Sequence, residues 1–254
     1  MENVQYRPEL LISEKKLRNK TIVSFIIFFA LLTAAVIGWN KIREQTKVDA
    51  VPGTIRSVLD YNEIIFANFL SNSHTARQYP VTEAVKNVRV NGDLGMGNDF
   101  NPNTWKLQVV RAPGDTLFLS LDDIKALPKT DIIFDFKCIE GWSQVTHWAG
   151  ARFSDFAAKY DLTTQSQMKY VALVTPDKRY YVGIDMASMM HPQTILCYEM
   201  NGKPLPMNQG YPLRLIIPVK YGIKHLKRIG TLSFSNERPP DYWYERGYDY
   251  FSGL

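Results

Sequence analysis

The longest apolar run of the chain lies near its N-terminus, over 21–39. It holds 19 residues without a charged side chain (TIVSFIIFFALLTAAVIGW). A helix of that length measures roughly 28 Å, close to the hydrocarbon thickness of a bilayer. Trp39 at its end and Lys41 just beyond it are typical of a membrane interface. The run therefore predicts one retained transmembrane helix, and a cleaved signal peptide is the alternative interpretation.

Basic residues flank this run unequally. Five precede it and three follow it: Arg7, Lys15, Lys16, Arg18 and Lys20, then Lys41, Arg43 and Lys47. Because the more basic flank stays in the cytoplasm, we expect 1–20 to be the cytoplasmic tail of a single-pass protein of the inner (cell) membrane. The remainder of the chain then faces the periplasm or exterior.

A second hydrophobic pattern follows within the stretch 40–80. A polar stalk runs to Pro52, and from Ile55 onward apolar residues such as Val58, Leu59 and Ile65 recur at helical spacing. This pattern predicts a linker that contains an amphipathic helix. The helix either packs on the following domain or lies at the bilayer surface.

The residues 81–254 show the irregular mixture of patterns typical of one globular domain. Gly and Asn punctuate 88–103 and predict loops. Alternating or continuously apolar segments predict strands over 105–110, 131–136, 169–174, 179–184, 195–200, 213–218 and 230–234, and helices over 120–126 and 152–160. Short strands and helices that alternate irregularly favour an α+β fold with a mixed sheet.

Composition narrows the function. The chain has 45% hydrophobic and 22% charged residues and a net charge of +5 that is spread along it, which favours an ordinary core and argues against nucleic acid as a partner. It has two cysteines and neither a CxxC pair nor an HExxH motif, so zinc has no support. The absence of GxSxG, GxGxxG and P-loop motifs leaves hydrolase, Rossmann and NTPase functions unsupported.

Cys138 is the strongest candidate for chemistry. It follows an apolar strand, precedes Gly141-Trp142 and neighbours Lys137, whose charge would favour a thiolate. A thiolate is the ligand that a soft, redox-active metal selects. Simple core packing is the alternative for Cys138, and it is the interpretation we prefer for Cys197.

Two cations further along the chain could bind a phosphate. Arg214 follows a Gly-Tyr-Pro turn, and Lys227 lies in the basic stretch 220–228. Arg would make a two-pronged contact and Lys would act as a point charge. A solvated basic face is the alternative. The histidines His147, His191 and His225 are expected to be structural residues that hydrogen-bond within the fold.

The motifs around these residues occur in an order that identifies a family. They are KCIEGWS at 137–143, YEMNGKPLP at 198–206, GYPLRL at 210–215, PVKYGIK at 218–224 and ERPP at 237–240. From about Asn91 to the C-terminus, the chain resembles the molybdopterin-binding domain of the sulfite oxidase superfamily. The resemblance implies the α+β fold of that family, with a mixed sheet, and the transmembrane helix that the apolar run predicts precedes it and lies outside the resemblance.

The resemblance also implies a cofactor and its contacts. Cys138 would ligate the metal of a molybdenum-molybdopterin cofactor and be the catalytic residue. Matching positions in the family imply that the cofactor contacts Asn91, Thr175, Gln209, Arg214, His225, Leu226 and Lys227. Gln209 departs from the family pattern, because relatives often carry His or Asn there.

Within the superfamily, the chain most resembles the periplasmic protein-methionine-sulfoxide reductases. That branch implies oxygen-atom transfer from a sulfoxide-like substrate, small or protein-borne, with electrons from a membrane haem or quinone-linked partner. An oxidoreductase of sulfite or another oxyanion is the alternative, which a cationic pocket built by Arg152 would favour. A neutral aromatic pocket with Trp142, Trp148 or Tyr248 would favour a sulfoxide. The third possibility is a tethered binding module without catalytic metal.

Overall fold

The computed structural model describes residues 13–69 and 74–254. The chain divides into two compact units, one formed by 1–48 with 52–55 and the other by 49–51 with 56–254. Arg7 and the other residues up to 12 lie outside the described residues, as does Leu70.

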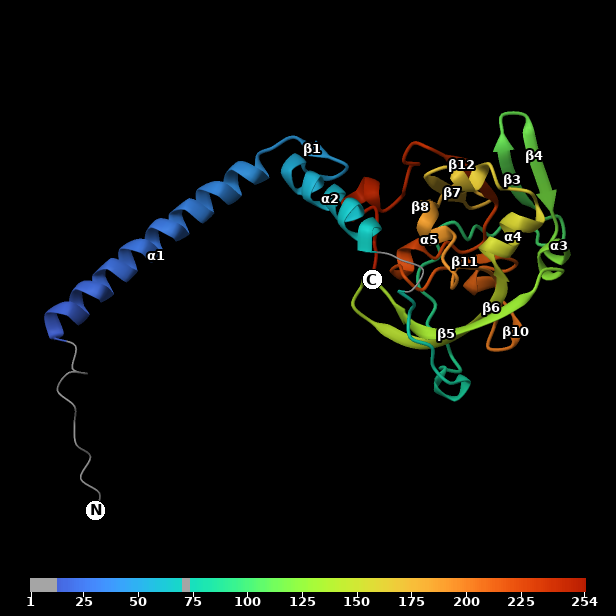
Figure 1. Ribbon diagram of the computed structural model, residues 1–254, viewed down its shortest axis with the longest axis horizontal. Helices are drawn as coiled ribbons and strands as arrows, with labels where there is room; N and C mark the ends of the chain where they lie inside the picture. The colour runs from blue at the N-terminus through green and yellow to red at the C-terminus, as the bar shows by residue number, and fades with distance from the viewer. Residues whose placement is uncertain (1–12, 70–73) are drawn as a thin grey trace, which may run out of the picture. The chain divides into compact units, whose positions relative to one another are not determined.

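The first unit is dominated by the helix α1 (Glu14–Arg43), drawn in blue in Figure 1. None of its residues is buried. It contains the whole predicted span 21–39 and extends beyond it at both ends, because the polar flanks offer no residue that breaks a helix. Among the described residues it is the one helix long and apolar enough to cross a membrane. The predicted polar stalk therefore starts only after Arg43.

The stretch between the helices holds two short strands, β1 (Lys47–Val48) and β2 (Val51–Pro52), before α2 (Gly53–Phe69). The helix predicted from Ile55 onward is confirmed, with its start two residues earlier. From Arg56 onward α2 belongs to the second compact unit, together with all of the chain that follows it.

The second unit is built on two five-stranded sheets. The first has the order β10 (Lys203–Pro204), β9 (Ile195–Met200), β6 (Ser143–Arg152), β5 (Lys129–Lys137), with β11 (Arg214–Ile216) also paired to β9. All its pairings are antiparallel. Figure 1 shows β5 and β6 as a long, strongly curved pair.

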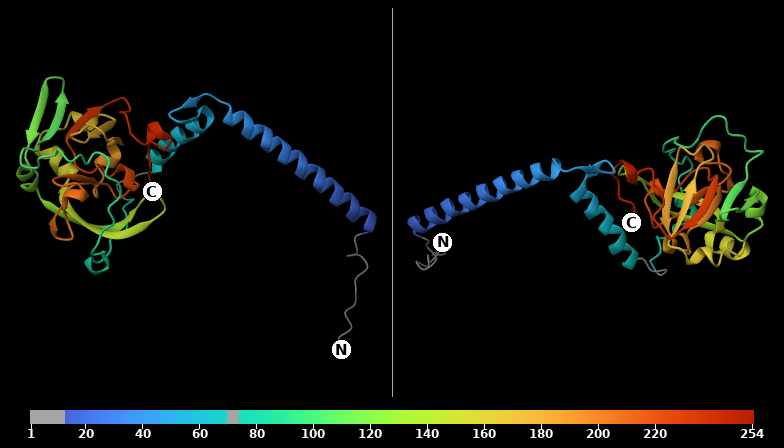
Figure 2. Two further views of the ribbon diagram at one scale, coloured as in Figure 1. Left: turned by 180° about the vertical axis from the view of Figure 1, so that it is seen from behind. Right: turned by 90° about the horizontal axis from the view of Figure 1, so that it is seen from above.

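The second sheet has the order β4 (Asp115–Leu119), β3 (Leu107–Ala112), β12 (Thr231–Ser235), β7 (Tyr170–Val174), β8 (Tyr181–Asp185). β12 runs parallel to β3 and antiparallel to β7. The sheet is therefore mixed, and the expected α+β class is confirmed. Figure 2 shows this sheet from two further directions.

Three short helices complete the unit: α3 (Leu121–Lys125), α4 (Phe153–Lys159) and α5 (Met186–Met189). A capping box starts α3, within the stretch 120–126 where a helix was predicted. The Asp123 backbone N–H donates to Ser120 Oγ at 3.2 Å, and the Ser120 backbone N–H donates to Asp123 Oδ2 at 2.7 Å. This reciprocal pairing satisfies donors that a helix start leaves free, which explains why so short a helix begins at a defined residue.

The sequence missed β6, which is the longest strand described. Its residues 146–151 are all buried and include Thr146 and His147, so no alternation of polar and apolar residues marks it. His147 keeps its place because its Nε2 lies 2.7 Å from Asp131 Oδ1 on the neighbouring strand. As expected, 88–103 contains no helix or strand.

The apolar faces of both sheets are buried. Cys197 lies within the cluster on the first sheet, fully buried beside Phe136, Trp148 and Ile216. The prediction that Cys197 is a core residue is confirmed. Cys138 is buried as well, but it lies outside this cluster, at the end of β5.

Candidate functional site

A tight turn between β5 and β6 places Cys138. The Cys138 backbone N–H donates to Trp142 O at 2.9 Å, and the Gly141 N–H donates to Cys138 O at 3.0 Å. Gly141 has a φ of +88°, which glycine adopts without steric cost. Because Lys137 pairs directly with Ser143, the turn follows immediately on the strands and leaves Cys138 only 2% exposed.

A cavity of about 310 Å³ opens beside this turn, within the size range of small-molecule sites. Residues from distant parts of the chain line it: Asn91, Gly92, Leu94, Phe136, Cys138, Ile139, Glu140, Tyr180, Arg214, Gly222, Ile223, His225, Lys227, Trp243 and Tyr248. Five of the predicted site residues, Asn91, Cys138, Arg214, His225 and Lys227, are thus brought together around one space.

Asn91 is the direct neighbour of the thiol. Its Nδ2 donates to Cys138 Sγ at 3.1 Å. Burial raises the pKa of Cys138, and the Glu140 carboxylate raises it further, whereas a backbone hydrogen bond at Glu140, the Asn91 bond and the Arg89 charge act in the opposite direction. Since burial dominates, the thiol is neutral at neutral pH.

Lys137 does not play the part that the sequence suggested. It is exposed, it lines a separate pocket, and it is not among the groups that shift the pKa of Cys138. Strand geometry is the reason, because successive side chains of β5 point to opposite faces.

Arg214 is a buried cation without a carboxylate partner among the described residues. Its Nη1 donates to Gln209 O at 3.1 Å and to Gln209 Oε1 at 2.9 Å, and its guanidinium lies 4.5 Å from the centre of the Trp148 ring. Its Nε is buried without a hydrogen-bond partner. Burial lowers the pKa of Arg214 to about 10. An anion in the cavity would satisfy both the charge and the orphaned N–H.

Lys227 is the second cation at the cavity. Its Nζ donates to Asn91 O at 2.6 Å, to Gly92 O at 3.0 Å and to Asn208 O at 3.4 Å. Burial, and then the charge of Arg214, lower the pKa of Lys227 to about 7. Three carbonyl oxygens therefore hold the ammonium group, which forms no ion pair among the described residues, although the charge of Asp93 acts to raise its pKa.

Gln209 connects Arg214 to the backbone of Val88 and Arg89. It is 2% exposed. While its Oε1 accepts from Arg214, its Nε2 donates to Val88 O at 3.3 Å and Arg89 O at 3.4 Å. It lines a smaller neighbouring cavity of about 20 Å³ together with Arg214 and Lys227. Gln209 thus sets the guanidinium against the loop that carries Asn91.

His225 faces the cavity as a neutral ring. Its Nε2 lies 3.1 Å from Lys220 O, and the Ile217 N–H donates to its Nδ1 at 3.4 Å. Burial, followed by the Arg214 charge, lowers the pKa of His225 to about 3. Because Nδ1 accepts, the proton lies on Nε2, and both ring nitrogens are engaged with the backbone, as expected for a structural histidine.

Two predicted contacts, Thr175 and Leu226, line neither this cavity nor the smaller one that Gln209 lines. The Thr175 hydroxyl donates to Asp177 Oδ1 at 2.7 Å in the turn between β7 and β8. Leu226 is fully buried in the larger apolar cluster. Cofactor contact by Thr175 and Leu226 stays a prediction.

The cavity has an aromatic wall that the sequence indicated only in part. Tyr248 was a candidate, and it packs edge-on against Trp243 with ring centres 5.0 Å apart. Tyr180 adds a third ring, and its hydroxyl donates to Ile223 O. Trp142 and Trp148 line the smaller cavity instead. Arg152 is exposed and lines neither cavity.

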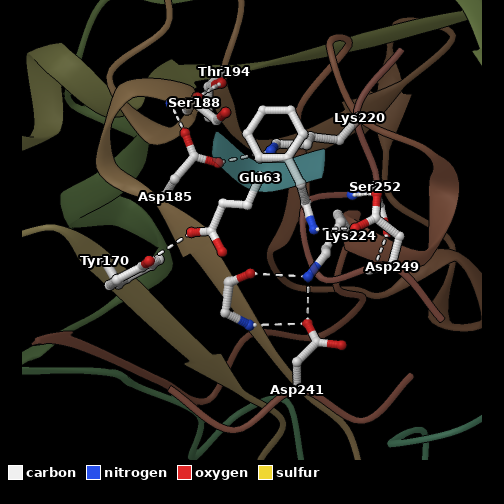
Figure 3. A network of polar contacts seen from close by, with 12 residues as sticks. Glu63, Tyr170, Asp185, Ser188, Thr194, Lys220, Lys224, Asp241, Asp249 and Ser252 are labelled. Carbon is white, nitrogen blue, oxygen red and sulfur yellow. Dashed lines mark hydrogen bonds and ion pairs between the residues drawn. The ribbon is translucent and has the colours of Figure 1, made fainter. Parts of the chain in front are cut away.

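Part of this wall lies on the segments 220–225 and 241–248. Buried ion pairs, which Figure 3 shows, hold both segments. Lys224 Nζ lies 2.5 Å from Asp241 Oδ2, and both side chains are 1% exposed. Asp241 Oδ1 also accepts from the Trp243 N–H at 3.1 Å. A parallel pair, Lys220 to Asp185 at 2.7 Å, anchors the start of the same segment. The cavity wall is therefore tied to the sheet on both sides.

Comparisons with known proteins agree with this geometry. Residues 94–243 match the model of the oxidoreductase molybdopterin binding domain. Candidate protein-methionine-sulfoxide reductase subunit YedZ1 of Azospira oryzae is 30% identical over 82% of this chain and 79% of that protein. The protein-methionine-sulfoxide reductase catalytic subunit MsrP of Campylobacter jejuni is 30% identical over 59% of this chain and 55% of its own length.

Mitochondrial sulfite oxidase of Rattus norvegicus is 32% identical over 61% of this chain. The match covers 33% of the oxidase, and the chain spans about half the length of the Campylobacter protein. The expected superfamily and the molybdenum-molybdopterin cofactor are confirmed by the family match. The chain belongs to the oxidoreductase molybdopterin binding domain family, within the sulfite oxidase superfamily.

Proposed function

We propose that the chain is a membrane-anchored molybdopterin oxidoreductase that reduces a sulfoxide, with Cys138 as the metal ligand. The observation that carries the proposal is the placement of Cys138 Sγ, Arg214 and Lys227 around one cavity of about 310 Å³. A soft ligand at one point, with the buried Arg214 and the half-buried Lys227 at another, fits a metal held by an organic anion.

The residues present fit this cofactor. Arg214 has a buried Nε without a partner, and Lys227 forms no ion pair with the described residues. Within the described part of the chain, no group of three or more His, Cys, Asp or Glu could hold a metal by itself. Cys138 would thus be the one protein ligand of a metal that the pterin carries.

Each residue then has a separate part. Cys138 supplies the thiolate, and the Asn91 amide holds its sulfur in place. Arg214 and Lys227 bind the phosphate, and Gln209 orients the guanidinium. His225, kept neutral by burial, adds no charge to the pocket. When bound, the cofactor supplies two-electron oxygen-atom transfer, and the protein supplies position and electrostatics.

The character of the wall supports a neutral substrate. Ile139, Trp243 and Tyr248 line the cavity next to Cys138, and Glu140 would repel an anion. Arg152, the cation that would have favoured sulfite, is elsewhere. The reaction is R₂S=O + 2H⁺ + 2e⁻ → R₂S + H₂O. The names of the Azospira and Campylobacter relatives support methionine sulfoxide as the substrate class.

The electrons require a donor. The helix α1 supports attachment to a membrane, and the excess of basic residues before it supports a cytoplasmic N-terminus with the catalytic unit in the periplasm or exterior. We therefore place the protein in the inner membrane, with a haem or quinone-linked membrane protein as its donor.

Metal analysis and paired assays test the proposal. Full-length protein from cells that make the pterin should contain about one molybdenum per chain and should reduce methionine sulfoxide with an artificial donor faster than it oxidises sulfite. Cys138→Ser should lose nearly all turnover while retaining pterin, whereas the buried control Cys197→Ser should keep its activity. Full turnover by Cys138→Ser would refute the ligand assignment. Preferred sulfite turnover would refute the substrate class, and the absence of both metal and pterin would indicate a binding module.

A further inference from the structure

The helix α2 is amphipathic in an unusual sense, because its charged face points inward. Arg56 is 3% exposed and Glu63 is 9% exposed. On the opposite face, Val58, Tyr61 and Ile65 are 60%, 62% and 48% exposed. The spacing 58, 61, 65 places these three side chains on one stripe. A helix of a soluble domain shows the reverse arrangement.

Specific bonds hold the charged face on the domain. Arg56 donates to Tyr248 O at 3.0 Å and to Tyr244 O at 2.8 Å. Arg238 forms ion pairs with Asp60 at 2.9 Å and with Glu63. The Tyr170 hydroxyl donates to Glu63 Oε1 at 2.5 Å, as Figure 3 shows. Because Arg56 and Glu63 are buried with these partners, rotating the helix to bury its apolar stripe would leave both charges without them. The outward direction of the stripe is therefore built into the fold.

Chain length indicates what covers the stripe. The stretch 44–52 joins α1 to α2, and a stretch of this length spans at most roughly 30 Å. If α1 crosses a bilayer, α2 cannot lie far from its surface. A helix with one apolar face, a polar opposite face and a tyrosine at its centre has the pattern of a helix that lies in the membrane interface.

We propose that the outer stripe of α2, formed by Val58, Tyr61 and Ile65, seats in the lipid headgroup region of the membrane that α1 crosses. The occupant is lipid. The inward face of the same helix holds the backbone of Tyr248, a cavity-lining residue, so lipid contact would also orient the catalytic unit at the bilayer. This inference rests on the membrane anchoring in the proposed function.

Spin labelling in proteoliposomes tests the proposal with the full chain. Single cysteines at Val58, Tyr61 and Ile65 receive a nitroxide, and collision with oxygen, which enters lipid, is compared with collision with a water-soluble nickel complex. Phe118 on β4, an apolar residue 58% exposed, gives the matched control. Cys138 and Cys197 are buried, and the unsubstituted chain provides the background.

We expect a higher oxygen-to-nickel collision ratio at the three stripe positions than at Phe118→Cys. Equal ratios at all four positions would overturn the proposal. Low collision with both probes at the stripe would overturn it too, because it would indicate a protein contact. A label at Ile27→Cys in α1 separates the two claims. If that label also fails to contact lipid, the membrane anchoring is wrong, whereas lipid contact at 27 alone refutes only the seating of α2. None of these readouts depends on turnover.

Discussion

Arg214 allows a sharp test, because its removal should change the stability of the cofactor-free protein little and weaken cofactor binding strongly. Burial lowers the pKa of Arg214 from 12.5 to about 10, which corresponds to about 3 kcal/mol against the charged form in the cofactor-free protein. Arg214→Met would remove this cost. It would also remove two hydrogen bonds to Gln209 and the contact with the Trp148 ring, which together are worth a similar amount. The free energy of unfolding should therefore change by less than about 2 kcal/mol.

Cofactor binding should respond far more strongly. Removing one partner of a buried charge pair costs about 2–5 kcal/mol, which is about 30- to 5000-fold in affinity. The assay is molybdenum and pterin content per chain after purification, beside denaturant unfolding of the cofactor-free protein. Arg152→Met is the matched control, because Arg152 is exposed and lines neither cavity.

Two outcomes would refute this reasoning. If Arg214→Met retains a full complement of cofactor, Arg214 does not bind the phosphate. If the variant loses several kcal/mol of stability before any cofactor is bound, the guanidinium is a structural residue whose hydrogen bonds outweigh its burial.

Three further predictions concern neighbouring charges. Because burial lowers the pKa of Lys227 from 10.5 to about 7, the unfolded cofactor-free chain binds one proton more than the folded chain between about pH 7 and 10. Its stability relative to Lys227→Met should therefore rise over that window, by about 3–5 kcal/mol at most, and a flat difference in unfolding free energy would contradict this. Asp241→Ala leaves Lys224 buried without its partner and should cost about 3–5 kcal/mol, whereas the double variant Lys224→Met with Asp241→Leu should cost clearly less in denaturant unfolding. Arg56→Gln should raise KM for the sulfoxide more than it lowers kcat, because Arg56 holds the Tyr248 carbonyl. Arg56→Lys should restore part of the loss, and an unchanged KM in steady-state assays would show that Tyr248 holds its place without Arg56.

The local patterns of the sequence predicted most of the elements. Where burial alternates along a segment, as in β7, periodicity marked the strand. Where a segment is buried on both faces, as in β6, periodicity carried no signal and the strand was missed. The start of α3 was predicted because the Ser120 cap depends on a contact only three residues away.

In the candidate site too, features that depend on local sequence were predicted, and features that depend on distant contacts were not. The motif around Cys138 made that residue conspicuous, since its turn is local and needs Gly141. The prediction that the charge of Lys137 favours a Cys138 thiolate was not supported, because neighbouring residues of an extended segment face opposite sides. Trp243 and Tyr180 were not candidates, because nothing near them in the sequence marks them, and only the packing of distant segments brings them to the cavity.

The sequence by itself determined the long apolar helix, the class of the fold and the identity of the thiol and the two cations. Tertiary structure alone decided that Arg214 has no carboxylate partner among the described residues, that Thr175 and Leu226 do not line the cavity, and that α2 turns Arg56 and Glu63 inward. The physical reason is the distance along the sequence over which the deciding contacts act. Helices, turns and caps depend on contacts a few residues apart, whereas burial of a charge depends on which remote groups surround it, and no local pattern records that.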